Sequence, residues 1–255
     1  MADNATQWKR FKYLFEQRAN RPLPPLEADL DYTQLPRSLV RSLAIFQLGE
    51  SGGGTVVSQA RASRLAEIDD NYTSALAHFV DEEHRHAGML AICVRLLGGE
   101  LIRENWTAKL FVFGRRLIGL RMKILVLLAA EVVGLCYYQL IASRLPPCNL
   151  RTWLLEIVAD ETSHLEFHCA FLRSQVRGPL SRFVFRSMWS SLMTASEFVV
   201  LIDHRRALRD LHISRSEVRA RWRSYRESAM CAVLQSPSES RRESQAACIS
   251  MVSSR

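Results

Sequence analysis

Two short motifs in this chain combine a carboxylate with an imidazole at the spacing of one helical turn. Glu83-x-x-His86 lies in the polar run DEEHRH, and Glu161-x-x-His164 is formed by the last four residues of DETSH. Residues three apart on a helix share a face, so each motif directs an oxygen and a nitrogen donor to one place. A single Glu-x-x-His is weak evidence, because chance supplies such pairs. The presence of two copies is what indicates a metal site.

Both motifs interrupt apolar stripes that recur at intervals of three and four residues, as on amphipathic helices. The remainder of the first polar run, with Asp81, His84 and Arg85, falls on other faces of the same helix. The first stripe consists of Leu76, Phe79, Glu83, His86, Leu90, Cys93 and Leu97, and the second of Leu154, Ile157, Glu161, His164, His168 and Phe171. Glu83, His86, Glu161 and His164 are therefore predicted to point into the core.

Each motif is preceded by a helical segment with one glutamate among apolar residues. Glu50 follows LAIFQLG and stands 33 residues before Glu83, and Glu131 lies in LVLLAAEVVG, 30 residues before Glu161. The chain thus repeats one unit, a helix with a lone glutamate and then a helix with Glu-x-x-His. We predict that the two units bring all four carboxylates to one place.

Four carboxylates in a helical core require neutralisation, because burying unpaired charges is very unfavourable. Protonation could rescue one or two of them at strongly raised pKa values. Two divalent cations would neutralise all four, and the two imidazoles would complete a hard oxygen and nitrogen ligand set. That set suits iron, with manganese as the alternative, and the lack of thiolates disfavours structural zinc.

Together the six residues resemble the ligand signature of the ferritin-like di-iron carboxylate superfamily, over about residues 36–178. The resemblance implies a ferritin-like four-helix bundle and two iron ions. It also implies that Glu83 and Glu161 bridge the metals while Glu50 and Glu131 are terminal ligands. The six expected ligands are Glu50, Glu83, His86, Glu131, Glu161 and His164.

Three further residues are candidates for supporting roles. DETSH resembles the DExRH form of oxygen-activating members, in which the Asp orients the metal-bound His of the partner helix; this makes Asp160 the candidate partner of His86. The family's Arg is replaced by Ser163. His168 is a seventh ligand, a donor behind the ligands or a satisfied core histidine. Tyr138, seven residues after Glu131, is the candidate catalytic residue, as a gate or a proton donor.

The fold is predicted to be all-α, since no segment alternates with period two for long enough to indicate a sheet. An irregular N-terminal segment (1–35), a helical bundle (36–235) with one or two additional C-terminal helices, and a disordered Ser- and Arg-rich tail (236–255) are expected. Asp69 or Asp70, Pro179 and the capping box of Ser214 and Glu217 mark helix starts. Predicted helices cover 36–66, 69–97, 107–144, 149–178, 179–208 and 214–235.

Composition restricts the partners and the cellular location that we expect for the protein. The net charge of +8 arises from arginines scattered along the chain without a basic stripe, so no nucleic-acid partner is expected. The six cysteines form no CxxC pair and the N-terminus has no apolar leader, which favours the cytoplasm. Residues 124–143 are apolar enough to span a bilayer, but they equally fit the centre of a large bundle. Peripheral membrane association stays open.

The preferred function is an oxidase or oxygenase that activates O2 toward an apolar acyl, aryl or similar substrate, free or carrier-bound, with electrons from a donor protein or reductase. A rubrerythrin-like peroxidase, a dimanganese catalase, a ferritin-like storage protein and a purely structural metal bundle are the alternatives. Glycines beside the lone glutamates, at 53, 54 and 134, leave space for a substrate or serve close helix packing. An apolar pocket is expected at Phe46, Leu127, Leu128 and Leu135, and a basic patch at Arg115, Arg116, Arg121 and Lys123. A homodimer stays open.

Overall fold

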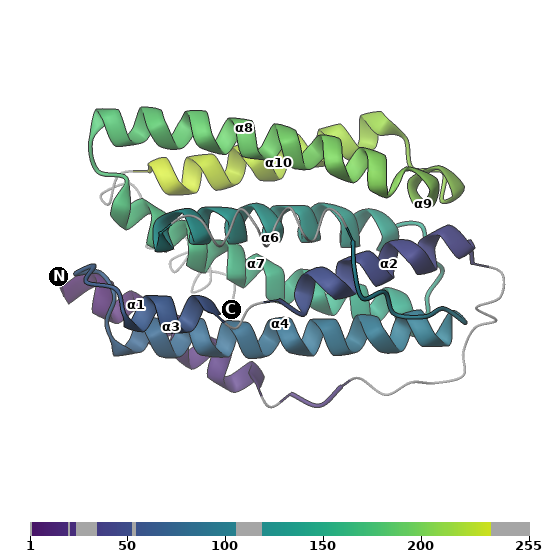
Figure 1. Cartoon of the computed structure of the whole chain (residues 1–255), viewed down its shortest axis with the longest axis horizontal. Coiled ribbons are helices and arrows are strands. Elements are labelled where there is room, and N and C mark those ends of the chain that lie inside the picture. Colours follow the sequence, from purple (N-terminus) through teal and green to yellow (C-terminus); the bar gives the residue numbers. More distant parts are fainter. Residues whose placement is uncertain (1, 20, 24–34, 53–54, 106–118, 236–255) are drawn as a thin grey trace, which may run out of the picture.

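The computed structural model of the chain describes residues 2–19, 21–23, 35–52, 55–105 and 119–235 (Figure 1). These ranges contain helices and no strands, which confirms the all-α class. The helices are α1 (Ala2–Ala19), α2 (Arg37–Glu50), α3 (Thr55–Arg61), α4 (Asp70–Leu96), α6 (Leu120–Ala142), α7 (Asn149–Gln175), α8 (Pro179–Asp203), α9 (Arg205–Asp210) and α10 (Arg215–Leu234).

Local sequence signals place several helix ends as predicted. Asp69 is the N-cap of α4, where its side chain accepts a 2.8 Å hydrogen bond from the backbone N–H of Tyr72. Just after α4, Gly98 adopts φ 71°, the left-handed conformation that ends many helices. Pro179 opens α8, and Ser214 with Glu217 forms the capping box of α10.

Two predicted helices differ from the observed ones. The helix predicted over 36–66 is two helices, because α2 ends at Glu50 and α3 begins at Thr55. Gly53 and Gly54, inside this break, lie outside the described residues. The helix predicted over 107–144 is observed as α6, and residues 107–118 are likewise outside the described ranges, as is the tail 236–255.

The prediction of an irregular segment over residues 1–35 is wrong for residues 2–19, which form α1. Trp8, Phe11 and Phe15 lie on one face of this helix and are fully or almost fully buried. The Trp8 indole N–H also donates a 2.9 Å hydrogen bond to the carbonyl of Glu67. α1 packs along α4 and forms part of the core near the candidate metal centre.

The long helices lie in layers that are visible in Figure 1. α6 packs against α7, α1 and α2 pack on α4, and α8 and α10 cover the other side of α6 and α7. Two apolar clusters fill the interior. Along α4 the first cluster ends at Val80 and the second begins at Met89; along α7 the second ends at Ile157 and the first resumes at Phe167. Both Glu-x-x-His motifs lie in the polar belt between these clusters.

α6 is the one described helix that is long and apolar enough to cross a membrane. In its most apolar stretch, 83% of the residues are buried against other helices of the same chain. A helix that is apolar nearly all round is also what the centre of a bundle requires, and α6 occupies that position.

Candidate metal centre

The centre is built around four side chains from two helices, Glu83 and His86 on α4 and Glu161 and His164 on α7. One potential ligand atom from each lies within 4.8 Å of all the others. The contacts are crosswise: Nδ1 of His86 is 3.3 Å from Oε1 of Glu161, and Nδ1 of His164 is 3.1 Å from Oε1 of Glu83. The stripes predicted for the two helices therefore face each other.

Polar atoms in this group are buried without hydrogen-bond partners. They include Nδ1 of both histidines, Oε1 of Glu83 and Oε2 of Glu161. Buried polar atoms are normally satisfied, so this convergence of unpartnered donors and acceptors is a group that could hold a metal ion. Carboxylate oxygens and imidazole nitrogens fit iron or manganese.

The two lone glutamates lie at the edges of the same group. Oε2 of Glu131 is 3.7 Å from Nδ1 of His164. Glu50, the last residue of α2, lies close enough to Glu83 for their carboxyl groups to interact. All six predicted ligands are thus brought to one place, and α2, α4, α6 and α7 each contribute.

Burial and close contact shift the pKa values of the groups in this centre. Burial, together with the charges of Glu83 and Glu161, raises the pKa values of Glu50 and Glu131 well above their ordinary range. Burial disfavours the charged form of His86, but its hydrogen bond to Asp160 and the nearby charges of Glu161 and Glu83 outweigh it and raise the pKa of His86 to about 9. Because metal ligands must be deprotonated, metal ions would take the place of the protons on these groups.

Each histidine of the centre is held from behind by a carboxylate on the opposite helix. Asp160, as predicted, places Oδ2 3.2 Å from Nε2 of His86. Its mirror is Glu82, whose Oε2 lies 2.7 Å from Nε2 of His164. With Nε2 turned toward a carboxylate in each pair, Nδ1 is left directed at the centre.

Glu82 was not predicted, although the sequence contains a signal for it. It precedes Glu83 as Asp160 precedes Glu161, so the repeat covers an acid-Glu-x-x-His unit. Its helical phase places it about 100° from Glu83, off the apolar stripe, yet it is 1% exposed because α7 covers it.

Asp160 is supported by arginines from the N-terminal part of the chain and not by residue 163, which is Ser163. Asp160 accepts hydrogen bonds of 2.6 and 2.8 Å from Arg21, and Arg18 lies 3.3 Å away. Burial opposes its ionisation, but His86 and Arg21 lower the pKa of Asp160 to about 2. Ser163 accepts a 3.1 Å hydrogen bond from Arg18, so α1 reaches the back of the centre at this position.

His168 lies one turn beyond His164, beside Glu131. Its Nε2 is 3.5 Å from Oε1 of Glu131, and neither ring nitrogen has a hydrogen-bond partner. Burial and the charge of His164 lower the pKa of His168 to about 3, so the ring is neutral at pH 7. Its unpartnered nitrogens distinguish it from a satisfied core histidine, and its role as a ligand stays a prediction.

Tyr138 closes the side of the centre at Glu50. Its hydroxyl donates a 2.5 Å hydrogen bond to Oε1 of Glu50, and burial with the nearby carboxylates raises the pKa of Tyr138 well above its usual value. A Cβ added at Gly134 would lie 3.3 Å from the Tyr138 ring and 3.8 Å from Cδ of Glu161. The space expected beside Gly134 is therefore occupied, and this glycine serves close packing.

Aromatic rings cover the opposite side of the centre. Phe79 meets His164 and His168 edge-on at centroid distances of 4.7 and 4.8 Å, and Phe15 of α1 meets His164 at 5.5 Å. These rings keep water from the imidazoles on that side.

The structure does not bring the described residues of the predicted pocket and basic patch together as expected. Leu127, Leu128 and Leu135 are buried core residues, whereas Phe46 is half-buried and stacks on Tyr137 at 4.1 Å. Lys123 is not part of an exposed patch, because it is 4% exposed and donates a 2.9 Å hydrogen bond to Thr55. Arg121 donates a hydrogen bond to the side chain of Gln175. Arg115 and Arg116 lie outside the described residues.

The chain was compared with protein-family models, with curated proteins and with solved structures, and none of them matched it.

Proposed function

We propose that this protein is a non-haem di-iron oxygenase or oxidase that uses O2 to oxidise an apolar organic substrate. The observation that carries the proposal is the buried quartet of Glu83, His86, Glu161 and His164, whose unpartnered oxygens and nitrogens face one another. Glu50 and Glu131 extend the quartet to four carboxylates and two imidazoles. Two divalent metal ions would balance its four carboxylate charges, and the donor types favour iron, with manganese as the alternative.

The helix arrangement supports a ferritin-like bundle as the scaffold. α2 with α4 and α6 with α7 are two neighbouring pairs, each with a lone glutamate on its first helix and Glu-x-x-His on its second. This is the distribution of ligands over four helices that di-iron carboxylate bundles use. On this assignment α8 and α10 are the additional C-terminal helices and α1 is an N-terminal addition.

Two ferrous ions held here would supply the electrons that activate O2. The chain's own residues would orient the imidazoles, shield the centre from water and supply a proton. Asp160 and Glu82 fix the two imidazoles, and Phe15 and Phe79 exclude water behind them. Tyr138 holds a proton at its hydroxyl oxygen, hydrogen-bonded to Glu50, and so places a proton donor at the centre.

The end of α2 is the proposed approach for substrate. The side chain of Glu83 is 13% exposed and Glu50 is half-buried, whereas those of His86, Glu161 and His164 are at most 2% exposed. Phe46, one turn before Glu50, adds a half-buried aromatic ring 5.1 Å from that of Tyr138. An apolar substrate, free or on a carrier, would meet aromatic surface there, and a separate donor protein in the cytoplasm would return electrons.

The proposal is tested with protein loaded anaerobically with Fe(II) and then given ¹⁸O2 and a panel of fatty acyl and aryl compounds. We expect oxygen consumption that accelerates with at least one compound and a product, found by mass spectrometry, that is hydroxylated with label or dehydrogenated without it. Glu161→Gln, which should not hold the metal pair, is the matched inactive control.

Two outcomes would replace the proposal. Progressive uptake of many irons per chain from excess Fe(II) in air would indicate storage. Rapid multi-turnover loss of hydrogen peroxide, without any oxidised organic product, would indicate a peroxidase or catalase.

A further inference from the structure

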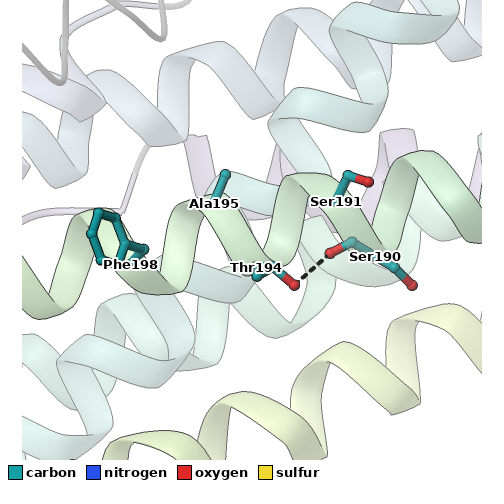
Figure 2. Close-up of a pocket in the computed structure, with 5 residues that line it drawn as sticks. All are labelled: Ser190, Ser191, Thr194, Ala195 and Phe198. Atoms are coloured by element: carbon teal, nitrogen blue, oxygen red, sulfur yellow. Dashed lines mark hydrogen bonds between the residues drawn. The ribbon is translucent and has the colours of Figure 1, made fainter.

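The outward face of α8 carries large apolar side chains at both ends and small ones between them. Leu180 is 75% exposed, Phe183 68%, Phe198 67%, Val184 43% and Ile202 42%. Between them a shallow hollow on the helix is lined by Ser190, Ser191, Thr194, Ala195 and Phe198 (Figure 2). Isolated exposed apolar residues are common, but several large ones along the outward face of one helix, which we call the stripe, indicate a contact surface.

Three pairs of residues on this face are symmetric about Ser191, and Phe183, about 80° around the helix from Ser191, stands outside the pattern. Leu180 and Ile202 stand eleven residues to either side of it, Val184 and Phe198 seven, and Ser187 and Ala195 four. At about 100° per residue, all six lie within about 40° of Ser191 around the helix axis. Reversing the helix therefore reproduces the same pattern of large and small residues.

Such a pattern fits a second copy of the same helix running antiparallel. A two-fold axis at Ser191 would place small residues where the helices cross, so their axes could approach closely. Toward the ends the two helices diverge, and there the stripe has its large side chains, with Val184 facing Phe198 of the second copy and Leu180 facing Ile202. Large residues would fill the widening gap.

Charged residues stay out of the stripe. Arg186 and Glu197 lie about 120–140° around the helix from Ser191, and Glu197 is 3.4 Å from Arg219 of its own chain. The serines at the centre of the stripe are unlike the continuous apolar face of a membrane-binding helix.

We propose that α8 is the interface of a homodimer, with two copies of the chain packed antiparallel about a two-fold axis at Ser191. This inference is independent of the proposed function, because α8 lies at the edge of the helix assembly in Figure 1 and the large residues of the stripe are exposed, whereas the centre is buried between α4 and α7. The metal-free Glu161→Gln protein should dimerise like the wild type, so the two proposals can fail separately.

Cysteine cross-linking tests the register of this dimer. In a background with Cys231→Ser and Cys248→Ser, Ser191→Cys should form an interchain disulfide in high yield, because residue 191 faces itself across the axis. Ser187→Cys is the matched control on the same exposed face. Its two copies would be about 12 Å apart along the helices, so it should cross-link poorly. Equal cross-linking at both positions, or at residue 187 alone, would overturn the proposed register.

Sedimentation of the full-length chain tests the interface itself. The wild type should be a dimer, and Phe198→Asp should raise the dimer dissociation constant about tenfold or more. Tyr13→Asp, at a similarly exposed aromatic on α1, should leave it unchanged. A wild-type monomer over the whole concentration range overturns the proposal, and flotation of that monomer with anionic phospholipid vesicles would assign the stripe to a membrane surface instead.

Discussion

Replacing Glu161 by glutamine is expected to abolish tight metal binding at the proposed two-metal centre, and Glu83→Gln should do the same. Each carboxylate lies between the two imidazoles of the centre, and its loss removes both a ligand and a negative charge. The reduction in affinity should exceed the roughly 10–100-fold typical of residues that only support a ligand. Glutamine keeps the volume of the side chain, so the fold should survive. Elemental analysis after anaerobic loading and desalting measures the effect.

Two control substitutions lie on the same helices. Glu166→Gln alters an exposed carboxylate on α7 that pairs with Arg10, and His84→Ala alters an exposed histidine two residues from His86 on α4. Both variants should retain wild-type metal content. If the His84 variant lost metal while the Glu83 variant kept it, the helical phase assigned to α4 would be wrong.

The second large effect concerns the carboxylates behind the histidines. Glu82→Gln and Asp160→Asn should each weaken metal affinity about 10–100-fold without changing the number of ions bound at saturation. The two effects should be similar in size, because Glu82 holds His164 as Asp160 holds His86. Competition with a chromophoric chelator measures the affinity.

Asp81→Asn is the matched control for Glu82, since Asp81 is the preceding residue and its side chain is 61% exposed. It should bind metal as the wild type does. A Glu82→Gln protein with unchanged affinity would mean that this contact does not position His164. Glu82 gives the cleaner result of the pair, because Asp160 also accepts hydrogen bonds from Arg21 and its loss could affect stability.

Spacing along the chain was sufficient to predict the candidate ligands. The three-residue spacing within each motif predicted four side chains that the structure brings together. The repeat at intervals of 33 and 30 residues added Glu50 and Glu131, which lie beside them. The cap residues Asp69 and Ser214 predicted two helix starts for the same reason, because capping depends on a few consecutive residues.

What could not be predicted depends on contacts between elements. α1 is polar overall, so its three aromatic residues could not be recognised as core residues without the surface of α4 on which they pack. Glu82 lies off the apolar stripe and reaches His164 because α4 and α7 are adjacent. Arg18 and Arg21 come from a segment far from Asp160 in sequence, so no spacing rule could connect them.

The central claim is that this buried group of carboxylates and imidazoles holds two metal ions, and counting the ions tests it most directly. The full-length protein would be freed of metal, reconstituted anaerobically with excess Fe(II), desalted and analysed for iron and protein. The account predicts two iron ions per chain, because two divalent cations balance the four carboxylates. One iron or fewer per chain, in protein that is folded by circular dichroism, would contradict it.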